Sequence, residues 1–279
     1  MKKRTLVISL FLIPFLAQAQ DYTPVAKVSK GQEYRYQSSI LSENTQTMGG
    51  QESKNSAKVK STQVNTIEDI KVDGTISVLT SVWDIETSAQ MNGIDTTIAI
   101  PGKAGDVTRN FFNSSGGALR KEIAEAATGS PGMNSGLNSG MTYTALFTDF
   151  PSKTLKPGDK WTREGTDTIT QAGFGGSMVL KVNTEYTYRG KTTDNTSGFF
   201  AVTYSSNLEI TGTGSMQGMD LNIEGSGMRI GTVTFDPANG ITQQDKGTTE
   251  LEMTISISGP TNMTLPITQK LEITSSLVK

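Results

Sequence analysis

Two residue types are missing from this sequence, cysteine and histidine. Without cysteine the chain has no disulfide, no thiol nucleophile and no thiol on which a bacterial lipoprotein anchor could be built. Without histidine it lacks the commonest general base and the commonest zinc ligand. These absences restrict any site chemistry to carboxylate, hydroxyl and amine groups.

Long apolar runs are also scarce, and the one near the start reads as an export signal. Basic residues at positions 2–4 precede an apolar run over 6–16, and small residues around Ala19 follow. The run is too short to span a bilayer, so we expect a cleaved signal peptide over 1–19 and no transmembrane span in the mature chain. The sequence therefore predicts a periplasmic or secreted protein without a lipid anchor.

Concentrated positive charge is absent beyond the signal peptide. Removing the three basic residues at positions 2–4 from the 25 in the chain leaves 22 against 27 acidic residues, a formal charge of −5. Binding to a polyanion requires a concentrated basic face, and no such stretch is visible. We therefore expect no nucleic acid partner.

Alternation with a period of two dominates the rest of the chain. Leu251, Met253 and Ile255 alternate with glutamate and threonine, a pattern of antiparallel sheet with one wet face. The predicted strands cover 33–41, 57–71, 75–88, 94–100, 106–112, 141–147, 160–170, 177–189, 199–211, 219–235, 241–257 and 264–277. Strands of this length favour a strongly curved sheet or half-barrel over a compact sandwich. The predicted fold is mostly β, with long antiparallel strands.

Landmarks recur at a nearly constant spacing, which indicates an internal duplication. Four pairs of glycines occur in the same order with offsets of 123 to 127 residues: Gly31 and Gly158, Gly74 and Gly198, Gly105 and Gly231, Gly117 and Gly240. Identity between the copies is low, and the conserved feature is the turn chemistry. We predict a first β-rich repeat over 20–149 and a second over 150–279, in one continuous sheet or in two domains.

One segment has helical rather than strand character. Residues 118–129 place Leu119 and Ile123 four positions apart among good helix formers and end at a glycine. The Gly-, Ser- and Asn-rich stretch 130–141, which contains Met133, predicts a loop. The sequence therefore predicts one short helix, followed by a loop that is either a plain insertion or a flap over a curved sheet.

No pattern with the requirements of a catalytic, cofactor or metal site stands out. Adjacent carboxylates, such as Glu68 with Asp69 and Glu250 with Glu252, are explained more simply as a charged wet face. The turn 236–240 carries too little charge for calcium. The glycines of 173–177 open no helix, so they predict a hairpin and not a phosphate loop. We predict a protein that is not an enzyme and has no cofactor.

Methionine supplies the remaining functional hint, because flexible thioethers suit apolar surfaces that accept varied ligands. The candidate lining residues are Met216, Met219, Met228 and Met253, with Leu119, Ile123 and Met133 as a candidate flap. The first hypothesis is an exported β protein that binds a lipid or an exposed protein segment on a concave sheet face. The alternative is a structural scaffold of the cell envelope with a closed core, which recruits an envelope protein by strand addition.

The central stretch resembles an uncharacterised family of exported bacterial proteins, domain of unknown function 6263. The resemblance is carried by an early Gly-x-x-Tyr strand and by Phe150-Pro151 followed by Lys156, Gly158, Asp159 and Trp161. Many members of that family are lipoproteins, and this chain departs from them in lacking cysteine. The resemblance implies a fold and a compartment, and no activity.

Overall fold

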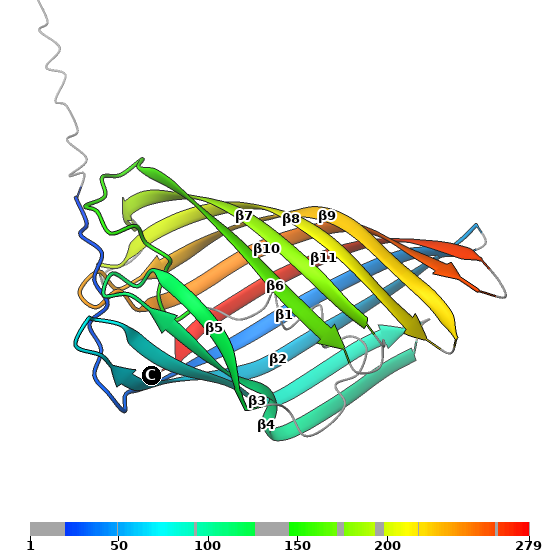
Figure 1. The fold of residues 1–279 in the computed structure, drawn as a ribbon, viewed down its shortest axis with the longest axis horizontal. Coiled ribbons are helices and arrows are strands. Elements are labelled where there is room, and N and C mark those ends of the chain that lie inside the picture. Colours follow the sequence, from blue (N-terminus) through cyan, green and yellow to red (C-terminus); the bar gives the residue numbers. More distant parts are fainter. Residues whose placement is uncertain are drawn as a thin grey trace, which may run out of the picture.

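The structure is a computed structural model that describes residues 20–48, 50–91, 94–125, 145–171, 176–192, 198–216, 218–259 and 262–278. Within these ranges the chain forms eleven strands and no helix, and all strands belong to one antiparallel sheet (Figure 1). The strands are β1 (Glu33–Met48), β2 (Gln51–Ile70), β3 (Ile76–Met91), β4 (Ile94–Phe112), β5 (Ala118–Glu125), β6 (Lys160–Gln171), β7 (Gly176–Lys191), β8 (Phe200–Met216), β9 (Met219–Phe235), β10 (Thr242–Ser258) and β11 (Met263–Val278).

The first and last strands, β1 and β11, lie side by side in the interior of the sheet. From this pair, β2 to β5 follow in order on one side and β10 back to β6 on the other. Tyr36 lies opposite Leu277 and Ile40 opposite Ile273 across the β1–β11 ladder. The two predicted repeats are therefore joined in one continuous sheet, and the mostly-β half-barrel expected from the sequence is confirmed.

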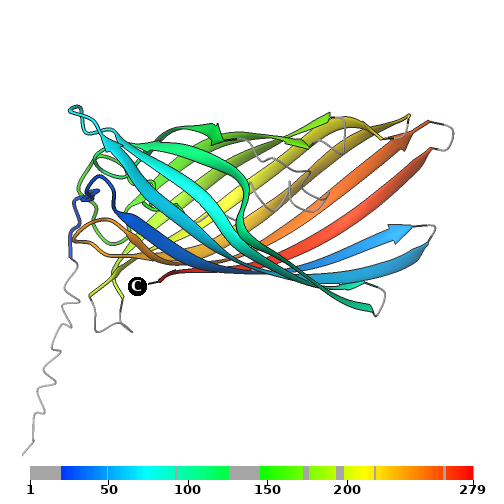
Figure 2. The ribbon, with the colours of Figure 1, turned by 90° about the horizontal axis from the view of Figure 1, so that it is seen from below.

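The sheet is strongly curled, so that its two edge strands approach each other (Figure 2). Lys121 Nζ of β5 lies 3.0 Å from Asp167 Oδ2 of β6. Every neighbouring pair in the sheet is antiparallel, and β5 and β6 stand at the first and eleventh places, so these two edges run in the same direction. An antiparallel ladder cannot close between them. We call the opening between β5 and β6 the seam.

The two faces of the sheet differ in polarity, as the alternation predicts. On β10 and β11 the inward-facing Leu251, Met253 and Leu271 are buried. Glu250 and Lys270 lie directly opposite each other on the outward face, and both are exposed. The apolar residues therefore line the concave side of the curl, and charged residues cover its outside.

The turns that precede β1 and β6 have the same geometry. Gly31 and Gly158 both have positive φ, 83° and 97°, a conformation that glycine adopts without strain. The Gly31 N–H donates to the Ile67 carbonyl at 2.8 Å, and the Gly158 N–H donates to the Tyr188 carbonyl at 2.8 Å. Both turns thus attach the start of a strand to the end of the next one, which explains why the sequence repeats this glycine.

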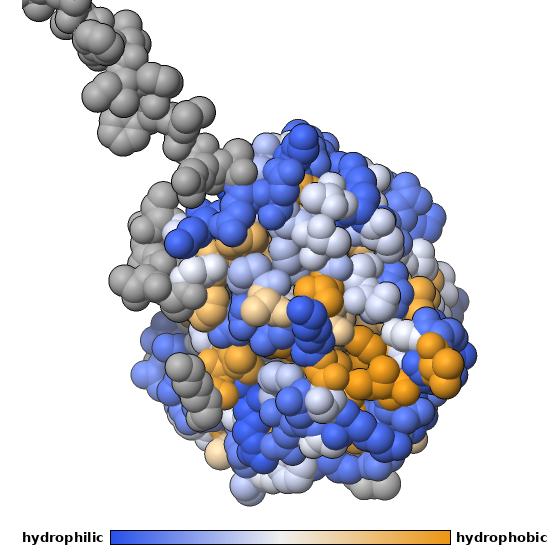
Figure 3. Space-filling model, turned by 90° about the vertical axis from the view of Figure 1, so that its left-hand side faces the viewer, coloured by the Kyte–Doolittle hydropathy of each residue, from blue (hydrophilic) through white to orange (hydrophobic). Residues whose placement is uncertain are grey.

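Two apolar clusters fill one end of the curl, which we call the base. The first consists of Tyr36, Ile67, Ile76, Val78, Phe112, Leu146, Phe147 and Ile241, and the second of Tyr22, Phe150, Leu155, Trp161, Tyr188, Phe200, Val202 and Phe235. Apolar side chains reach the surface between the polar loops of this end (Figure 3). The base is therefore a packed core that is formed by strand residues together with the segments that precede β1, β6 and β10.

The segments that enter β1 and β10 cross over within the base. Tyr22, which precedes β1, packs in the cluster of the second half, while Ile241, which precedes β10, packs in the cluster of the first half. Tyr22 and Leu155 exchange two backbone hydrogen bonds of 2.8 Å. Each half therefore depends on a segment that belongs to the other, so the halves form one cooperative unit.

The predicted helix over 118–129 is wrong. Residues 118–125 form strand β5, which pairs with β4. Arg120 and Glu122 point outward, where the Arg120 guanidinium lies 3.9 Å from the centroid of the Phe111 ring and Glu122 pairs with Arg109 at 3.0 Å. Contacts with the neighbouring strand thus override helix propensity, which is a weak preference of a few tenths of a kcal/mol per residue.

Two other boundaries differ from the prediction. The strands predicted at 94–100 and 106–112 are one strand, β4, whose pairing with β3 shifts register twice. Of the strand predicted at 141–147, Phe147 makes an isolated bridge with Ile241, and residues 141–144 lie outside the described residues. The loop or flap predicted over 130–141 also lies outside them.

Candidate functional site: the inner face of the curled sheet

An apolar surface occupies the inner face of the sheet at the end away from the base. It extends over β7 to β11, β1 and β2. Its buried members are Ile40, Met178, Leu180, Leu208, Ile210, Leu221, Ile223, Leu251, Met253, Ile257, Leu271 and Ile273, and Val59, Val182, Met219, Ile255, Leu265 and Ile267 pack against them half-buried. We call this set the apolar inner wall.

A polar belt separates the apolar inner wall from the base. Along β9, the inward-facing side chains pass from Leu221 and Ile223 through Arg229 to Phe235. The Tyr204 hydroxyl donates to Asp245 Oδ1 at 3.0 Å, and Arg229 Nη2 donates to Asp245 Oδ2 at 3.2 Å. Arg229 Nε also donates to the Tyr204 hydroxyl at 3.2 Å. The belt is therefore a hydrogen-bonded group that spans β8, β9 and β10.

Burial determines the protonation of this belt. Loss of solvent raises the pKa of Tyr204 well above its usual value, so the phenol remains a neutral donor. Burial likewise raises the pKa of Asp245, although the neighbouring Arg229 guanidinium opposes this effect. The polar belt, which consists of Tyr204, Arg229 and Asp245, is thus a buried ion pair to which a tyrosine hydroxyl is hydrogen-bonded.

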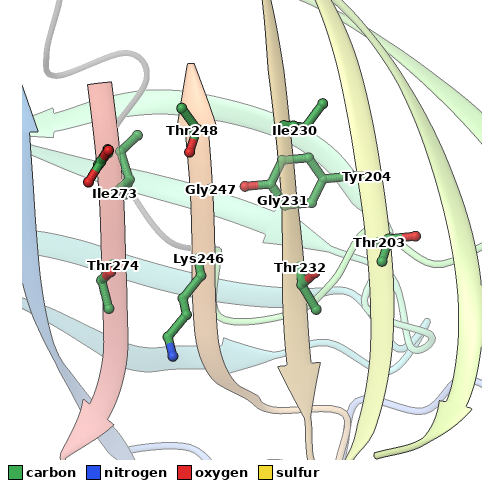
Figure 4. Close-up of a pocket in the computed structure, with 11 residues that line it drawn as sticks. Thr203, Tyr204, Ile230, Gly231, Thr232, Lys246, Gly247, Thr248, Ile273 and Thr274 are labelled. Carbon is green, nitrogen blue, oxygen red and sulfur yellow. The ribbon is translucent and has the colours of Figure 1, made fainter. Parts of the chain in front are cut away.

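Two glycines create the space that Tyr204 occupies. Gly231 and Gly247 lie directly opposite each other on β9 and β10, and the Tyr204 side chain extends across them toward β10 (Figure 4). A Cβ at either glycine would collide with the Tyr204 hydroxyl. On the outer side, the same region forms a shallow depression of about 520 Å³ bordered by Thr232, Lys246 and other polar residues.

Inward-facing apolar side chains are exposed on β4 and β5, near the edge of the sheet. Ile98 of β4 and Ile123 of β5 are 61% and 63% exposed. Thr87 of β3 lies directly opposite Val59 on one side and Ile98 on the other, so Ile98 points to the same inner face as Val59. Ile123 lies opposite Thr108, which is buried. The apolar character of the inner face therefore continues to an accessible edge of the sheet.

The predicted lining residues do not all lie on one face. Met253 is buried in the apolar inner wall and Met219 packs against it, whereas Met228 points outward and is 49% exposed. Met228 therefore cannot line the concave face. Met216 ends β8, and its side chain lies outside the described part of the chain.

Two of the predicted flap residues lie on a strand. Leu119 and Ile123 lie on β5 and not on a helix, and both are exposed. Met133 lies outside the described residues. The structure thus places Ile123 at the seam, as part of a strand edge.

The paired carboxylates of the sequence occupy the outer face. Glu68 accepts two hydrogen bonds from Arg109, at 2.6 and 2.8 Å, and one from Ser77 at 2.7 Å. The hydrogen bonds from Arg109 hold the pKa of Glu68 below its usual value. Glu68 is therefore an ionised structural anchor between β2 and β4, which is the opposite of a general acid.

Within the described ranges, no group of three or more carboxylates could hold a metal ion. In the same residues, no helix is long and apolar enough to cross a membrane. The inner face is a large apolar surface bounded by hydrogen-bonding groups. Such a surface suits the binding of an apolar ligand.

Sequence reasoning did not identify the polar belt. Arg229 and Asp245 each occur in polar surroundings on a strand, and their contact depends on the register between β9 and β10. One signal was present, since Gly225, Gly227 and Gly231 share a single parity of β9. Glycine at alternate positions of a strand often marks a close approach by another side chain.

No protein-family model matches this chain, and no curated protein matches its sequence. Among solved structures, an outer membrane channel from Pseudomonas putida F1 is similar at 12% identity with a TM-score of 0.27, covering 89% of this chain and 97% of its own. OccK7 (OpdD) of Pseudomonas aeruginosa is similar at 8% identity with a TM-score of 0.25, covering 89% and 99%. OpdQ of Pseudomonas aeruginosa has 9% identity and a TM-score of 0.22, covering 88% and 99%. Likeness at this level carries no functional argument.

Proposed function

We propose that this chain is an exported protein of the cell envelope that binds an apolar ligand on its inner face. The ligand is an acyl chain or an exposed apolar segment of a client protein, and no catalysis is involved. The observation that carries the proposal is the continuous apolar inner wall on seven neighbouring strands whose outer faces are polar.

A ligand needs access to the apolar inner wall. Its buried members are at most 9% exposed, so a ligand reaches them only when the curled sheet opens. The seam is the natural place, because the Lys121–Asp167 ion pair bridges it and both side chains are more than one third exposed. Such pairs contribute at most about 1 kcal/mol, so opening the seam here costs little. The exposed Ile98 and Ile123 give a ligand its first apolar contacts.

A matched pair of variants tests this binding surface. Met219 and Met228 lie on the same strand, one facing inward against the apolar inner wall and the other facing outward. Met219→Lys is expected to weaken binding of the fluorescent probe N-phenyl-1-naphthylamine about tenfold, equivalent to about 1.4 kcal/mol, because it places an ammonium against the apolar ligand. Met228→Lys is expected to leave the affinity unchanged.

The measurement is a fluorescence titration, together with lipid extraction and mass spectrometry of protein made in its native compartment. Equal loss of affinity in both variants would show that the probe senses general charge. Absence of both probe binding and copurified lipid in the parent protein would refute the proposed function.

A second candidate function, an envelope scaffold that recruits a partner by strand addition, is favoured by the direction of the edge strands. Since β5 and β6 run in the same direction, one strand running opposite to both could pair with each of them. The outward-facing residues of β6 include the exposed Thr166. A cysteine there would be unique, because the chain contains none.

Thr166→Cys carrying a photoreactive benzophenone tests the scaffold. A partner inserted at the seam is expected to crosslink stoichiometrically from this position and not from Ser205→Cys, which is exposed in the interior of the sheet on β8. Recovery of uncrosslinked monomer from both positions would count against the scaffold and would leave the ligand-binding proposal intact.

A further inference from the structure

Five polar residues interrupt the apolar inner wall on neighbouring strands. Gln269 of β11 lies opposite Asn44 of β1, which lies opposite Asn55 of β2. Ser42 is two positions from Asn44 on the same face, and Thr249 of β10 is two positions from Leu251, which lies opposite Gln269. We call Ser42, Asn44, Asn55, Thr249 and Gln269 the inner amide cluster. It is surrounded by Ile40, Val59, Leu251, Met253, Ile267 and Leu271 of the apolar inner wall.

The cluster has hydrogen-bond capacity that the chain leaves unused. Gln269 Nε2 and Asn44 Nδ2 both donate to the Ser42 hydroxyl, at 3.3 and 3.4 Å. The carbonyl oxygens Gln269 Oε1 and Asn55 Oδ1 and the hydroxyl of Thr249 are buried without a hydrogen-bond partner. Gln269 is 7% exposed and Thr249 is fully buried. Buried polar atoms without partners are uncommon in native proteins, and each one requires an explanation.

The kind of group that would satisfy these atoms follows from their chemistry. An amide carbonyl oxygen only accepts, and a threonine hydroxyl both donates and accepts. A ligand must therefore present O–H or N–H donors to Gln269 and Asn55. A carboxylate or phosphate would face two carbonyl oxygens, which repel it. The nearby Arg229 guanidinium already binds Asp245 and Tyr204, so it gives an anion little compensation.

We propose that the inner amide cluster binds the neutral, donor-bearing head group of a single-chain amphiphile whose hydrocarbon chain lies along the apolar inner wall. The head group is a glycerol, another alcohol or an amide, and not an acid. This inference rests on the proposed ligand-binding function and specifies the ligand class. It explains why polar residues that are costly to bury stand in the middle of an apolar surface: they select among ligands with the same chain.

Three ligands of equal chain length separate the possibilities. 1-Monolauroylglycerol carries two hydroxyl donors, methyl laurate carries none, and laurate is an anion. Each is used to displace N-phenyl-1-naphthylamine from the full protein at pH 8. We expect 1-monolauroylglycerol to displace the probe at a concentration at least tenfold below that required for methyl laurate, with laurate no better than the methyl ester.

Variants locate the preference at the cluster. Gln269→Met retains the length of the side chain and removes the amide, and Thr249→Val retains its shape and removes the hydroxyl. Each is expected to reduce the tenfold preference for 1-monolauroylglycerol to about twofold, while the affinity for methyl laurate stays the same or improves. Thr254→Val is the control, because Thr254 lies on β10 and points outward. The thermal midpoint of each ligand-free variant shows whether it is folded.

The outcomes distinguish this inference from the proposed function. If the probe binds and all three ligands displace it equally, or if laurate displaces it best, the inner amide cluster is not a head-group site although the inner face binds apolar ligands. If the preference survives in both Gln269→Met and Thr249→Val, the head group binds elsewhere, and the inference is overturned. If the probe does not bind the parent protein, the proposed function itself fails.

Discussion

Replacing Phe150 with alanine is expected to lower the free energy of unfolding by about 3 to 5 kcal/mol, which is typical of a fully buried phenylalanine. The Phe150 ring is 1% exposed. It packs edge-on against Tyr22 and Phe235, with ring centroids 5.3 and 4.9 Å apart, and it also contacts Trp161. The substitution leaves a cavity where the Phe150 ring was. The backbones of Tyr22 and Phe235 are fixed by hydrogen bonds to neighbouring segments, so their rings cannot move in to fill this cavity.

The measurement is urea unfolding monitored by tryptophan fluorescence, since Trp161 lies in the same cluster. Phe150→Leu is the matched control and should lose only about 1 to 1.5 kcal/mol, because it retains most of the apolar volume. A loss below about 1 kcal/mol in Phe150→Ala would show that the base is not the packed core of the molecule.

Phe150→Ala should also change hydrogen exchange in a segment far from residue 150 in the sequence, because the segments cross within the base. Tyr22 joins the base cluster of the second half although it precedes β1, the first strand of the first half. Loss of Phe150 should therefore increase hydrogen exchange at the base ends of β7 to β9 and also in the segment around Tyr22. Exchange confined to residues near Phe150 in the sequence would argue against the crossed arrangement.

The alternation of apolar and polar residues predicted well which face of the sheet each side chain occupies, but it did not predict which strands pair. The shared parity of Leu251, Met253 and Ile257 correctly assigned them to one buried face. Pairing of β1 with β11 joins residues more than 200 positions apart, and no local pattern specifies it. The curl that brings Lys121 to Asp167 depends on that pairing, so the seam could not be predicted either.

The prediction for Met228 was wrong for a reason that the sequence already contained. Met219 and Met228 are nine positions apart within one predicted strand, and an odd spacing in a strand places two side chains on opposite faces. Applying the alternation to the methionines would have retained Met219 and removed Met228. The helix prediction failed differently, because residues 118–125 alternate weakly and their pairing with β4 decides the outcome.

The second large expected effect concerns the space beneath Tyr204. Gly247→Ala is expected to cost about 2 to 4 kcal/mol of stability, because the new methyl group displaces the tyrosine and breaks its hydrogen bond to buried Asp245. Gly165→Ala is the matched control. Gly165 lies on β6 with nothing within 4 Å of the added carbon, so its substitution should change stability by no more than about 0.5 kcal/mol.

A double-mutant cycle assigns the cost to the tyrosine. Tyr204→Ala alone should be destabilising, since it leaves Asp245 without its phenol donor and opens a cavity. Once Tyr204 is absent, Gly247→Ala has no ring to displace, and its cost should fall by at least about 1 kcal/mol relative to the parent background. Additive effects in chemical denaturation would mean that the alanine clashes with the backbone carbonyl of Ile230, which lies 3.0 Å from the added carbon, and that the tyrosine moves aside without loss. Coupling of the expected size would show that the glycine pair provides the space for the Tyr204 side chain. The glycines would then also be required for the polar belt, which separates the apolar inner wall from the base.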